Sequence, residues 1–325
     1  MADVSVIIAT YRRPHLIGRA LDSIARQTTP PREIIVVDDA SGDDTGEVVA
    51  AWSRQNGIAV RFITAGVNGG AGVARNLGMA AASGPLIAFL DSDDEYAPDA
   101  LERLAAPLAN HPDAVVSFAD AMQHWADDTP GIPMMRRCLT PGVEADSIDG
   151  DLFRLKDPQS VLLLTSMIPT CAAVFRRAAA EAAGWMPDYR HGEDWIFWLK
   201  LTDRGDFLCQ FVDVATVHRQ GDNLTGSEHD LRNAQMTLNA FLKLRDGDFG
   251  VALTDANRRR LDAAIAEKAS HLRYHASRKG LRSWWKAIGS AEGRATGGRM
   301  HHLLVDPKSL IRSLRFGPGR DQDAI

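Results

Sequence analysis

The first hundred residues alternate between short apolar runs and longer segments with helical spacing, which restricts the chain to few folds. Four of the runs have strand length and a β-rich composition: Val4–Thr10, Glu33–Val37, Val60–Ile63 and Leu86–Leu90. Continuous apolar runs of this kind are typical of strands buried on both faces of a parallel sheet. The alternation therefore predicts an α/β fold, in which helices cover both faces of a mostly parallel sheet.

Polar residues follow each of the four predicted strands near the point where the strand ends. The clusters are Thr10-Tyr11, Asp38-Asp39, Asn68-Gly69-Gly70 and Asp91–Asp94. Ligands of open α/β sheets bind outside the carboxyl ends of the strands. Four polar clusters at one edge of the sheet therefore predict a binding site there.

The segment Asp91-Ser92-Asp93-Asp94-Glu95 is the densest group of charges in this part of the chain. Carboxylates this close repel one another unless a cation lies between them. Mn²⁺ and Mg²⁺ prefer oxygen ligands, and Mg²⁺ is commonly held by one or two carboxylates together with substrate phosphates. The segment therefore predicts a site for a metal-bound diphosphate, and the alternative interpretation is a solvated acidic turn.

The Gly-rich loop 68–72 does not match a dinucleotide-binding fingerprint, because Arg75 stands where that pattern requires another glycine. Such a loop lets the backbone approach a ligand closely. Arg75, on the helix that follows, could bind a phosphate through two hydrogen bonds, or it could be a solvated surface residue. Asp39 could accept a hydrogen bond from a base N–H, or it could cap the next helix together with Asp38.

Two further candidates lie after residue 190. Glu193 and Asp194 begin an apolar helix. They either stabilise the helix N-terminus, as acidic residues do, or supply a general base that faces a sugar hydroxyl. His218 follows a predicted strand, and its imidazole could join carboxylates around a metal or could be an ordinary surface group.

The later part of the chain has a different pattern. Residues 119–160 interrupt the alternation and are predicted to form an irregular insertion over the site. Helices are predicted over Leu231–Leu244 and Asp255–Lys279, and the Gly- and Arg-rich tail from Gly289 is predicted to be poorly ordered. The predicted domains are residues 1–227 and, as a helical C-terminal region, residues 228–325.

Charge is distributed unevenly between these two regions. The whole chain has a formal net charge of -5, which argues against a general nucleic-acid-binding protein. Residues 228–325 nevertheless contain 18 Lys and Arg against 11 Asp and Glu. With Trp284-Trp285 between Arg282 and Lys286, this excess suggests peripheral contact with an anionic membrane or a lipid-linked acceptor. The alternative is a solvated helical appendage or a contact between copies in an oligomer.

The cysteines and the N-terminal residues bear on location. Cys138, Cys171 and Cys209 form no C-x-x-C pair, so neither a disulfide framework nor a zinc site is expected, and a reducing cytosol fits. The first residues lack the basic and apolar segments of a secretion signal, and no stretch approaches the roughly 20 apolar residues of a spanning helix. We expect a cytoplasmic protein that is either free in the cytoplasm or peripheral to the inner face of the membrane.

Taken in order, five segments resemble the motifs of the inverting glycosyltransferases of family 2. They are Val4–Pro14, Glu33–Ser41, Asn68–Asn76, Phe89–Asp94 and Gly192–Trp195. The resemblance implies the GT-A nucleotide-sugar-binding fold. It also implies transfer of a sugar from a UDP- or dTDP-sugar to a glycan or lipid-linked acceptor, in bacterial polysaccharide or other surface-glycan synthesis. The implied cofactor is a divalent metal, Mn²⁺ or Mg²⁺.

The resemblance also implies roles for single residues. Asp194 would be the general base that deprotonates the acceptor hydroxyl, with Glu193 beside it. Asp91 and Asp93 would form the pair that reaches the ribose and the metal, and His218 would be a further metal ligand. The nucleotide-sugar would contact Thr10, Tyr11, Arg13, Asp39, Asn68, Gly70, Arg75, Asp91 and Ser92.

Three competing classes of protein share part of this pattern. A nucleotidyltransferase has a Gly-rich basic loop directly after its first strand, where this chain has Thr10–Pro14 without glycine. A haloacid-dehalogenase-type phosphatase ends its first strand with D-x-D, whereas three predicted strands precede the motif here. A non-catalytic sugar-nucleotide-binding partner on the same fold would not need all the acidic positions that this chain has. A donor-hydrolysis assay distinguishes these classes.

Overall fold

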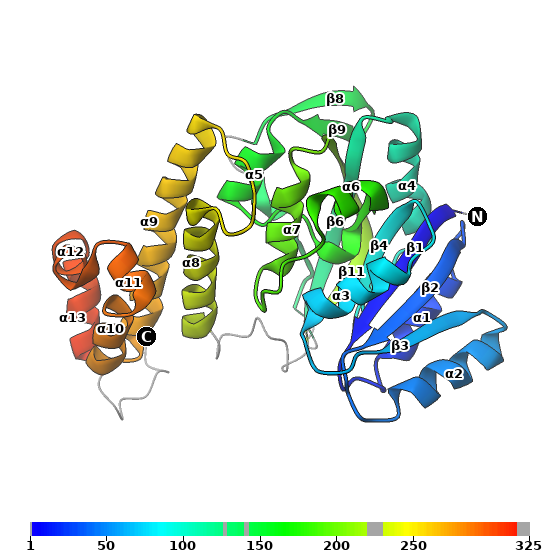
Figure 1. Ribbon diagram of the computed structural model, residues 1–325, viewed down its shortest axis with the longest axis horizontal. Coiled ribbons are helices and arrows are strands. Elements are labelled where there is room, and N and C mark those ends of the chain that lie inside the picture. The colour runs from blue at the N-terminus through cyan, green and yellow to red at the C-terminus, as the bar shows by residue number, and fades with distance from the viewer. Residues whose placement is uncertain (1, 126–128, 140–142, 220–229, 317–325) are drawn as a thin grey trace. The chain divides into compact units, whose positions relative to one another are not determined.

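The computed structural model describes residues 2–125, 129–139, 143–219 and 230–316. The chain separates into two compact units, residues 1–220 and residues 221–325. The first unit contains the β-sheet and the second is helical (Figure 1). The boundary predicted between residues 227 and 228 lies outside the described residues.

A mixed sheet of eleven described strands forms the centre of the first unit. Its order is β3, β2, β1, β4, β10, β6, β11, β9, β8, with the short β5 beside β11 and the short β7 beside β6. The first four strands run parallel to one another, as predicted, and β10 lies antiparallel between β4 and β6. The strands are β1 (Ala2–Thr10), β2 (Pro31–Asp38), β3 (Val60–Thr64), β4 (Leu86–Asp91), β5 (Glu95–Tyr96), β6 (Ala114–Trp125), β7 (Ile132–Pro133), β8 (Ala145–Asp149), β9 (Leu152–Leu155), β10 (Ala173–Arg176) and β11 (Asp206–Arg219).

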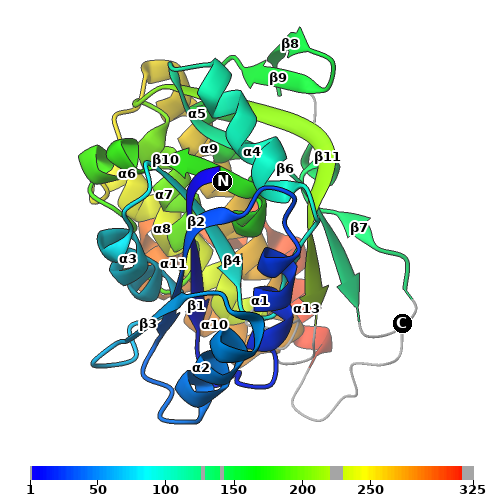
Figure 2. The same cartoon turned by 90° about the vertical axis from the view of Figure 1, so that its right-hand side faces the viewer.

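Helices cover both faces of the sheet (Figure 2). The alternation of side chains along β1 decides which face each helix meets. Val4, Val6 and Ile8 form one core with α1, α2 and α4. Ile7 points to the opposite face, where α3 packs so closely that a side chain at Gly78 would collide with it. The helices of this unit are α1 (Ile17–Ala25), α2 (Thr45–Asn56), α3 (Ala71–Ala81), α4 (Ala100–Asn110), α5 (Pro158–Leu164), α6 (Arg177–Ala183) and α7 (Glu193–Leu201).

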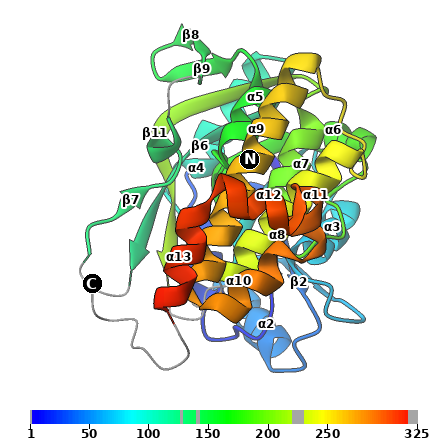
Figure 3. The same ribbon diagram turned by 90° about the vertical axis from the view of Figure 1, so that its left-hand side faces the viewer.

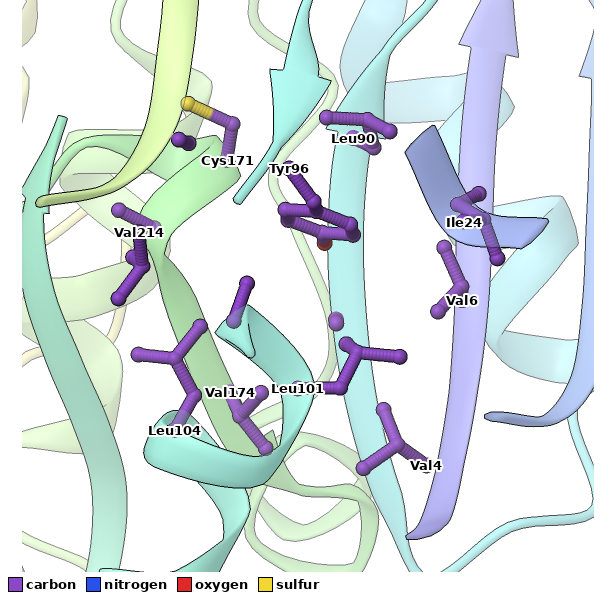
Figure 4. Close-up of a cluster of buried hydrophobic side chains, with 14 of the residues drawn as sticks. Val4, Val6, Ile24, Leu90, Tyr96, Leu101, Leu104, Cys171, Val174 and Val214 are labelled. Atoms are coloured by element: carbon purple, nitrogen blue, oxygen red, sulfur yellow. The ribbon is translucent and has the colours of Figure 1, made fainter. Parts of the chain in front are cut away.

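Both cores hold the strand ends in place. On one face, side chains of β1 and β4 interlock with Ile24 of α1 and with Leu101 and Leu104 of α4 (Figure 4). On the other face, Phe175 stands between Phe89 of β4, at 5.2 Å between ring centroids, and Phe197 of α7, at 5.1 Å. Burial of each such side chain contributes about 1.5–3 kcal/mol. The aromatic contacts therefore fix α7 relative to the end of β4.

The described part of residues 119–160 is more regular than the irregular insertion that their composition suggested. β6 continues to Trp125, because it pairs with β11 along its length as far as Arg219. β8 and β9 then form a hairpin whose turn contains Gly150 in the left-handed region (φ 51°). β8 is an edge strand with mostly polar, exposed residues, and β9 has only four residues, so neither shows a clear strand pattern in the sequence.

The second unit contains α8 (Asp230–Asp246) and α9 (Asp255–Arg278), which match the two predicted helices. The prediction of a poorly ordered tail from Gly289 is wrong as far as Phe316, because this stretch forms short helices. They are α10 (Leu281–Ile288), α11 (Ala291–Ala295), α12 (Gly298–Val305) and α13 (Pro307–Arg315). The glycines and polar residues mark helix ends: Ser290 and Asp306 accept backbone N–H groups at the starts of α11 and α13.

The two tryptophans of α10 differ in environment. Trp284 is fully buried and its indole N–H donates to Oγ of Ser309 at 2.9 Å, whereas Trp285 is half-exposed. Of the two tryptophans in the suggested membrane or acceptor contact, only Trp285 is therefore exposed. Within the described residues, no helix combines the length and the apolar composition needed to cross a membrane.

Candidate active site

Most of the predicted site residues lie at one edge of the sheet, where β1, β2 and β4 end. The strand register places Thr10 beside Asp38, and β4 ends at Asp91 alongside β1. Residues near the starts of α3 and α7 join them, because Arg75 contacts both Asp91 and Glu193. Sheet register and two helix starts thus determine the geometry of this edge.

Arg75 is the centre of the site and is 5% exposed, so the surface interpretation is wrong. Its Nη2 donates to Oδ1 of Asp91 at 2.7 Å, and its Nη1 donates to Oε1 of Glu193 at 3.2 Å. The guanidinium also lies over the ring of Phe89, 5.6 Å from the centroid. A buried guanidinium stays charged, and its desolvation is costly unless carboxylates pair with it. Arg75 therefore joins the carboxylate at the end of β4 to the carboxylate at the start of α7.

The pKa of the Glu193 carboxyl group is raised. Burial, together with the charge of Asp194, raises the pKa of Glu193 to about 7, and Arg75 only partly offsets this. Gly72 makes the arrangement feasible, because a Cβ there would lie 2.9 Å from Cγ of Glu193. A carboxyl group with a pKa near neutrality in a cluster of charges is typical of a functional site.

Asp194 is held by a residue that sequence reasoning missed. Its Oδ2 accepts a hydrogen bond from Oγ1 of Thr170 at 2.7 Å, and its Oδ1 accepts one from the backbone N–H of Trp195 at 2.7 Å. Thr170 begins a short 3₁₀ turn before β10. These bonds orient a partly exposed carboxylate at the first turn of α7.

Asp39 organises the Gly-rich loop. Its carboxylate accepts hydrogen bonds from the Nδ2 of Asn68 at 2.9 Å and from the backbone N–H groups of Gly69 and Gly70, both at 2.8 Å. Asp39 does not cap α2, whose cap position is Asp44. Asp38, in turn, accepts hydrogen bonds from Ser41. Hydrogen bonds to the buried Asp39 thus hold the Gly-rich loop at the end of β2.

The acidic segment after β4 is paired with basic side chains of the first helix region. Arg13 forms an ion pair with Asp93, and Arg19 donates to the backbone carbonyl of Asp93. Burial and the neighbouring Asp91 still raise the pKa of Asp93, and burial raises the pKa of Asp94 further. Burial is the largest cause of both shifts, and Asp93 and Asp94 are only 7% and 4% exposed. The solvated-turn interpretation is therefore wrong.

The predicted metal set of Asp91, Asp93 and His218 does not gather in one place. Among the described residues, no group of three His, Cys, Asp or Glu side chains is close enough to hold a metal ion. His218 contacts the last residues of the acidic segment: its Nε2 lies 3.0 Å from Oε1 of Glu95, and its backbone N–H donates to Oδ1 of Asp94 at 3.2 Å. Asp91 and Asp93 remain, and a pair of carboxylates with excess negative charge fits Mn²⁺ or Mg²⁺, which take further ligands from phosphate and water.

The residues that follow β1 complete the edge. The hydroxyl of Thr10 is buried and has no hydrogen-bond partner among the described residues. Tyr11 is partly exposed, and the guanidinium of Arg12 lies 5.1 Å from the centroid of its ring. Ser92, by contrast, is buried. A buried hydroxyl without a partner costs free energy and is a candidate contact for a ligand.

Two further contacts had no signal in the sequence. Arg190 donates from Nη2 to the backbone carbonyl of Asn68 at 2.9 Å, which ties the loop before α7 to the Gly-rich loop. Asn76 exchanges hydrogen bonds with the backbone of Met186 at 2.9 and 3.0 Å. Both join segments more than a hundred residues apart, which no local pattern reveals.

A model of glycosyl transferase family 2 matches residues 5–184, more than half of the chain. The chain therefore belongs to glycosyl transferase family 2, as its ordered motifs predicted.

Several curated relatives are similar to this chain. The poly(ribitol-phosphate) β-N-acetylglucosaminyltransferase TarS of Staphylococcus aureus is 33% identical over 236 residues, which cover 70% of this chain and 38% of TarS. The succinoglycan biosynthesis protein ExoO of Rhizobium meliloti is 43% identical over 102 residues, 31% of this chain and 28% of ExoO. A GalNAc(5)-diNAcBac-PP-undecaprenol β-1,3-glucosyltransferase of Campylobacter jejuni is 38% identical over 104 residues, 32% of this chain and 34% of that protein. The match thus spans about a third of each relative.

Solved structures share the fold. Staphylococcus aureus TarS in complex with UDP-GlcNAc superposes with a TM-score of 0.64 at 20% identity, over 88% of this chain and 79% of that one. The mannosyltransferase PcManGT of Pyrobaculum calidifontis, in complex with GDP-Man and Mn²⁺, superposes with a TM-score of 0.56 at 21% identity, over 96% and 86%. The predicted GT-A fold is confirmed.

Proposed function

We propose that this protein is an inverting glycosyltransferase. It transfers a sugar from a UDP- or dTDP-sugar to a hydroxyl of a glycan or lipid-linked acceptor, in the synthesis of a bacterial polysaccharide or another surface glycan. Family membership supports glycosyl transfer, and the TarS complex with UDP-GlcNAc supports a UDP-sugar donor. The names of TarS and of the Campylobacter jejuni relative support a polymer or lipid-linked acceptor.

The bridge made by Arg75 is the observation that carries the proposal. One buried guanidinium contacts Asp91, in the segment that would meet the diphosphate, and Glu193, beside the proposed base. Donor and acceptor groups must lie within a few ångströms of each other for a direct displacement. The pairing of Arg75 with Glu193, 118 positions apart in the sequence, brings the two motifs within that distance of each other.

The proposed chemistry assigns each group a task. The anomeric carbon becomes oxocarbenium-like as the nucleotide leaves. Asp194, oriented by Thr170, takes the proton from the acceptor hydroxyl, which attacks from the face opposite the leaving group. One displacement inverts the anomeric centre. Glu193 keeps Arg75 in place, and the guanidinium charge stabilises the diphosphate as it leaves.

The donor site draws on the strand ends. Thr10 and Tyr11 would contact the nucleoside, and Asp39 would shape its pocket through Asn68 and Gly70. Arg13 and Ser92 flank the acidic pair. When bound by Asp91 and Asp93, Mn²⁺ or Mg²⁺ would neutralise negative charge on the diphosphate.

Asp194→Asn tests the proposed base. The amide keeps the size of the side chain but accepts no proton, so kcat should fall about 10²–10⁴-fold while donor affinity stays close to wild type. Asp203→Asn, at an exposed position after α7, is the matched control and should keep full activity. The product's anomeric configuration, read by NMR, should be inverted. A folded Asp194→Asn protein with turnover within about tenfold of wild type would contradict the assignment.

Donor binding is tested separately by thermal shift. UDP or dTDP at a hundredfold excess over Kd should stabilise the protein by about 2.7 kcal/mol with Mn²⁺ or Mg²⁺. Excess EDTA should abolish the shift, and Asp93→Asn should weaken it. An equal shift in EDTA excludes a metal-bridged diphosphate, and nucleotide binding without any turnover indicates a non-catalytic binding protein.

A further inference from the structure

Helices α12 and α13 present apolar side chains to solvent. Met300, Leu304 and Val305 of α12 and Ile311 and Leu314 of α13 are all exposed, with 71% at Met300 and 77% at Leu304. Met300 and Leu304 are four residues apart, and Ile311 and Leu314 are three apart, so each pair shares one helix face. We call these five residues the α12–α13 surface; Figure 3 shows the two helices beside α10. A helix of a globular protein normally turns such a face inward.

A buried polar network fixes this orientation. Ser309 of α13 faces inward, where its Oγ accepts from the indole of Trp284 and its N–H donates to Oδ1 of Asp306 at 3.1 Å. Nε of Arg273 donates to Oδ2 of Asp306 at 3.2 Å, and its Nη1 lies 3.1 Å from Nδ1 of His302 on α12. Turning either helix to bury its apolar face would leave these groups without partners. The exposure is therefore a consequence of specific hydrogen bonds.

The surroundings of the α12–α13 surface are basic. Residues 281–316, all of which the structure describes, contain seven arginines and lysines and only two acidic residues. Neither acid is exposed: Glu292 is buried against Gln235 and Asn239, and Asp306 is paired with Arg273. The exposed basic residues are Arg282, Lys286, Arg294, Arg299, Lys308 and Arg315.

One of these residues continues the surface onto α10. The guanidinium of Arg299 lies 4.7 Å from the ring centroid of Trp285, which is 43% exposed. An aromatic ring beside a cation and near exposed aliphatic side chains is typical of residues that lie at the headgroup level of a membrane.

We propose that the α12–α13 surface binds an anionic lipid bilayer. Its apolar side chains enter the headgroup region, and the basic side chains around them contact lipid phosphates. A second copy of the chain fits less well, because a symmetric contact would place these basic helices against each other. The proposal involves only the second unit, so it does not depend on the proposed transfer reaction.

Vesicle flotation of the full chain tests the proposal. Vesicles of phosphatidylcholine and phosphatidylglycerol should carry the protein, vesicles of phosphatidylcholine alone should carry much less, and high salt should weaken the binding. The double variant Lys308→Gln, Arg315→Gln should lower the partition coefficient roughly fivefold for each charge. The double variant Leu304→Ser, Ile311→Ser should lower it at least about tenfold, because the apolar contribution is lost.

A matched control separates a defined surface from general charge attraction. Arg258 and Arg259 are exposed at the opposite end of α9, roughly 30 Å along that helix from the residues that contact α13. Arg258→Gln, Arg259→Gln removes the same charge and should leave binding within about twofold of wild type. Equal losses in control and test variants, or no binding to phosphatidylglycerol vesicles at low salt, overturns the proposal. The proposal is also overturned if light scattering shows a molecular mass that rises with protein concentration and only the double variant Leu304→Ser, Ile311→Ser abolishes this rise, because the surface would then bind a second copy of the chain.

Discussion

Each unit of this protein contains a buried arginine paired with a carboxylate, but the two surroundings differ. Arg273, 7% exposed, bonds to Asp306 and His302. Because the guanidinium donates only, Nδ1 of His302 accepts, and its Nε2 donates to the carbonyl of Gly293 at 2.8 Å. Burial lowers the pKa of His302, which favours this neutral form. The network is closed and balanced in charge.

Arg75 has an open network with excess negative charge. Its partner Asp91 is 40% exposed, and the pKa of Glu193 is raised to about 7. Asp93 and Asp94 nearby also have raised pKa values. A balanced buried pair supports the packing of its unit, whereas clustered carboxyl groups with raised pKa values at a sheet edge are typical of a functional site. Charge balance, more than burial, distinguishes the two arginines.

Replacing Arg75 should produce the largest effect. Arg75→Met leaves Asp91 and Glu193 without their cation, so kcat/KM should fall by about 10²–10³-fold, as when one transition-state donor is removed. Steady-state kinetics on folded protein measures this, with Arg61→Met on β3 as the control. Activity within a few-fold of wild type would mean that the bridge is only structural.

Arg273→Met should instead act on stability. Leaving the partly buried carboxylate of Asp306 without its cation should cost up to about 3 kcal/mol of unfolding free energy. The specific activity of the folded fraction should stay within about threefold of wild type, because no residue of the second unit belongs to the proposed site. Urea unfolding and activity, measured on the same samples, check both statements. A selective loss of turnover without a loss of stability would reverse the contrast with Arg75.

The raised pKa of Glu193 predicts a pH dependence of stability. An acid with a higher pKa in the folded state binds more protons when folded, so its contribution to stability decreases as pH rises from 4.5 to about 7. Glu193→Gln removes this term. The variant should therefore gain on the order of 1–3 kcal/mol relative to wild type across that window. Unfolding curves measured at pH 4.5 and about pH 7 test this prediction, with Glu181→Gln at an exposed position of α6 as the control. A difference in stability that does not change with pH would refute it.

Thr170 should have the smallest effect of the four. Thr170→Val removes the hydrogen bond to Asp194, so kcat should fall several-fold while KM for the donor stays unchanged. The loss in stability should be about 1 kcal/mol. Thr170→Ser restores a hydroxyl and should rescue most of the turnover. Failure of that rescue would show that Thr170 acts through packing instead of through Asp194.

Much of the first unit could be predicted from local patterns. The strands that end at Thr10, Asp38 and Asp91 were recognisable because buried parallel strands are continuously apolar and their ends are polar. The strands β7, β8 and β9 were not: β7 and β9 have only two and four residues, and β8 is an edge strand whose polar side chains face water. The helices after Gly289 were missed because caps and glycines at short helix ends have the composition of a loop.

The sequence by itself determined the family, the fold class and the residues that reach the sheet edge, because each depends on short segments read in order. Only the tertiary structure decided what those residues contact. Arg75 became a buried bridge to Glu193, His218 paired with Glu95, and Thr170 reached Asp194. Such partners are brought together by sheet register and helix packing, so the pairing energy depends on positions that no local pattern encodes.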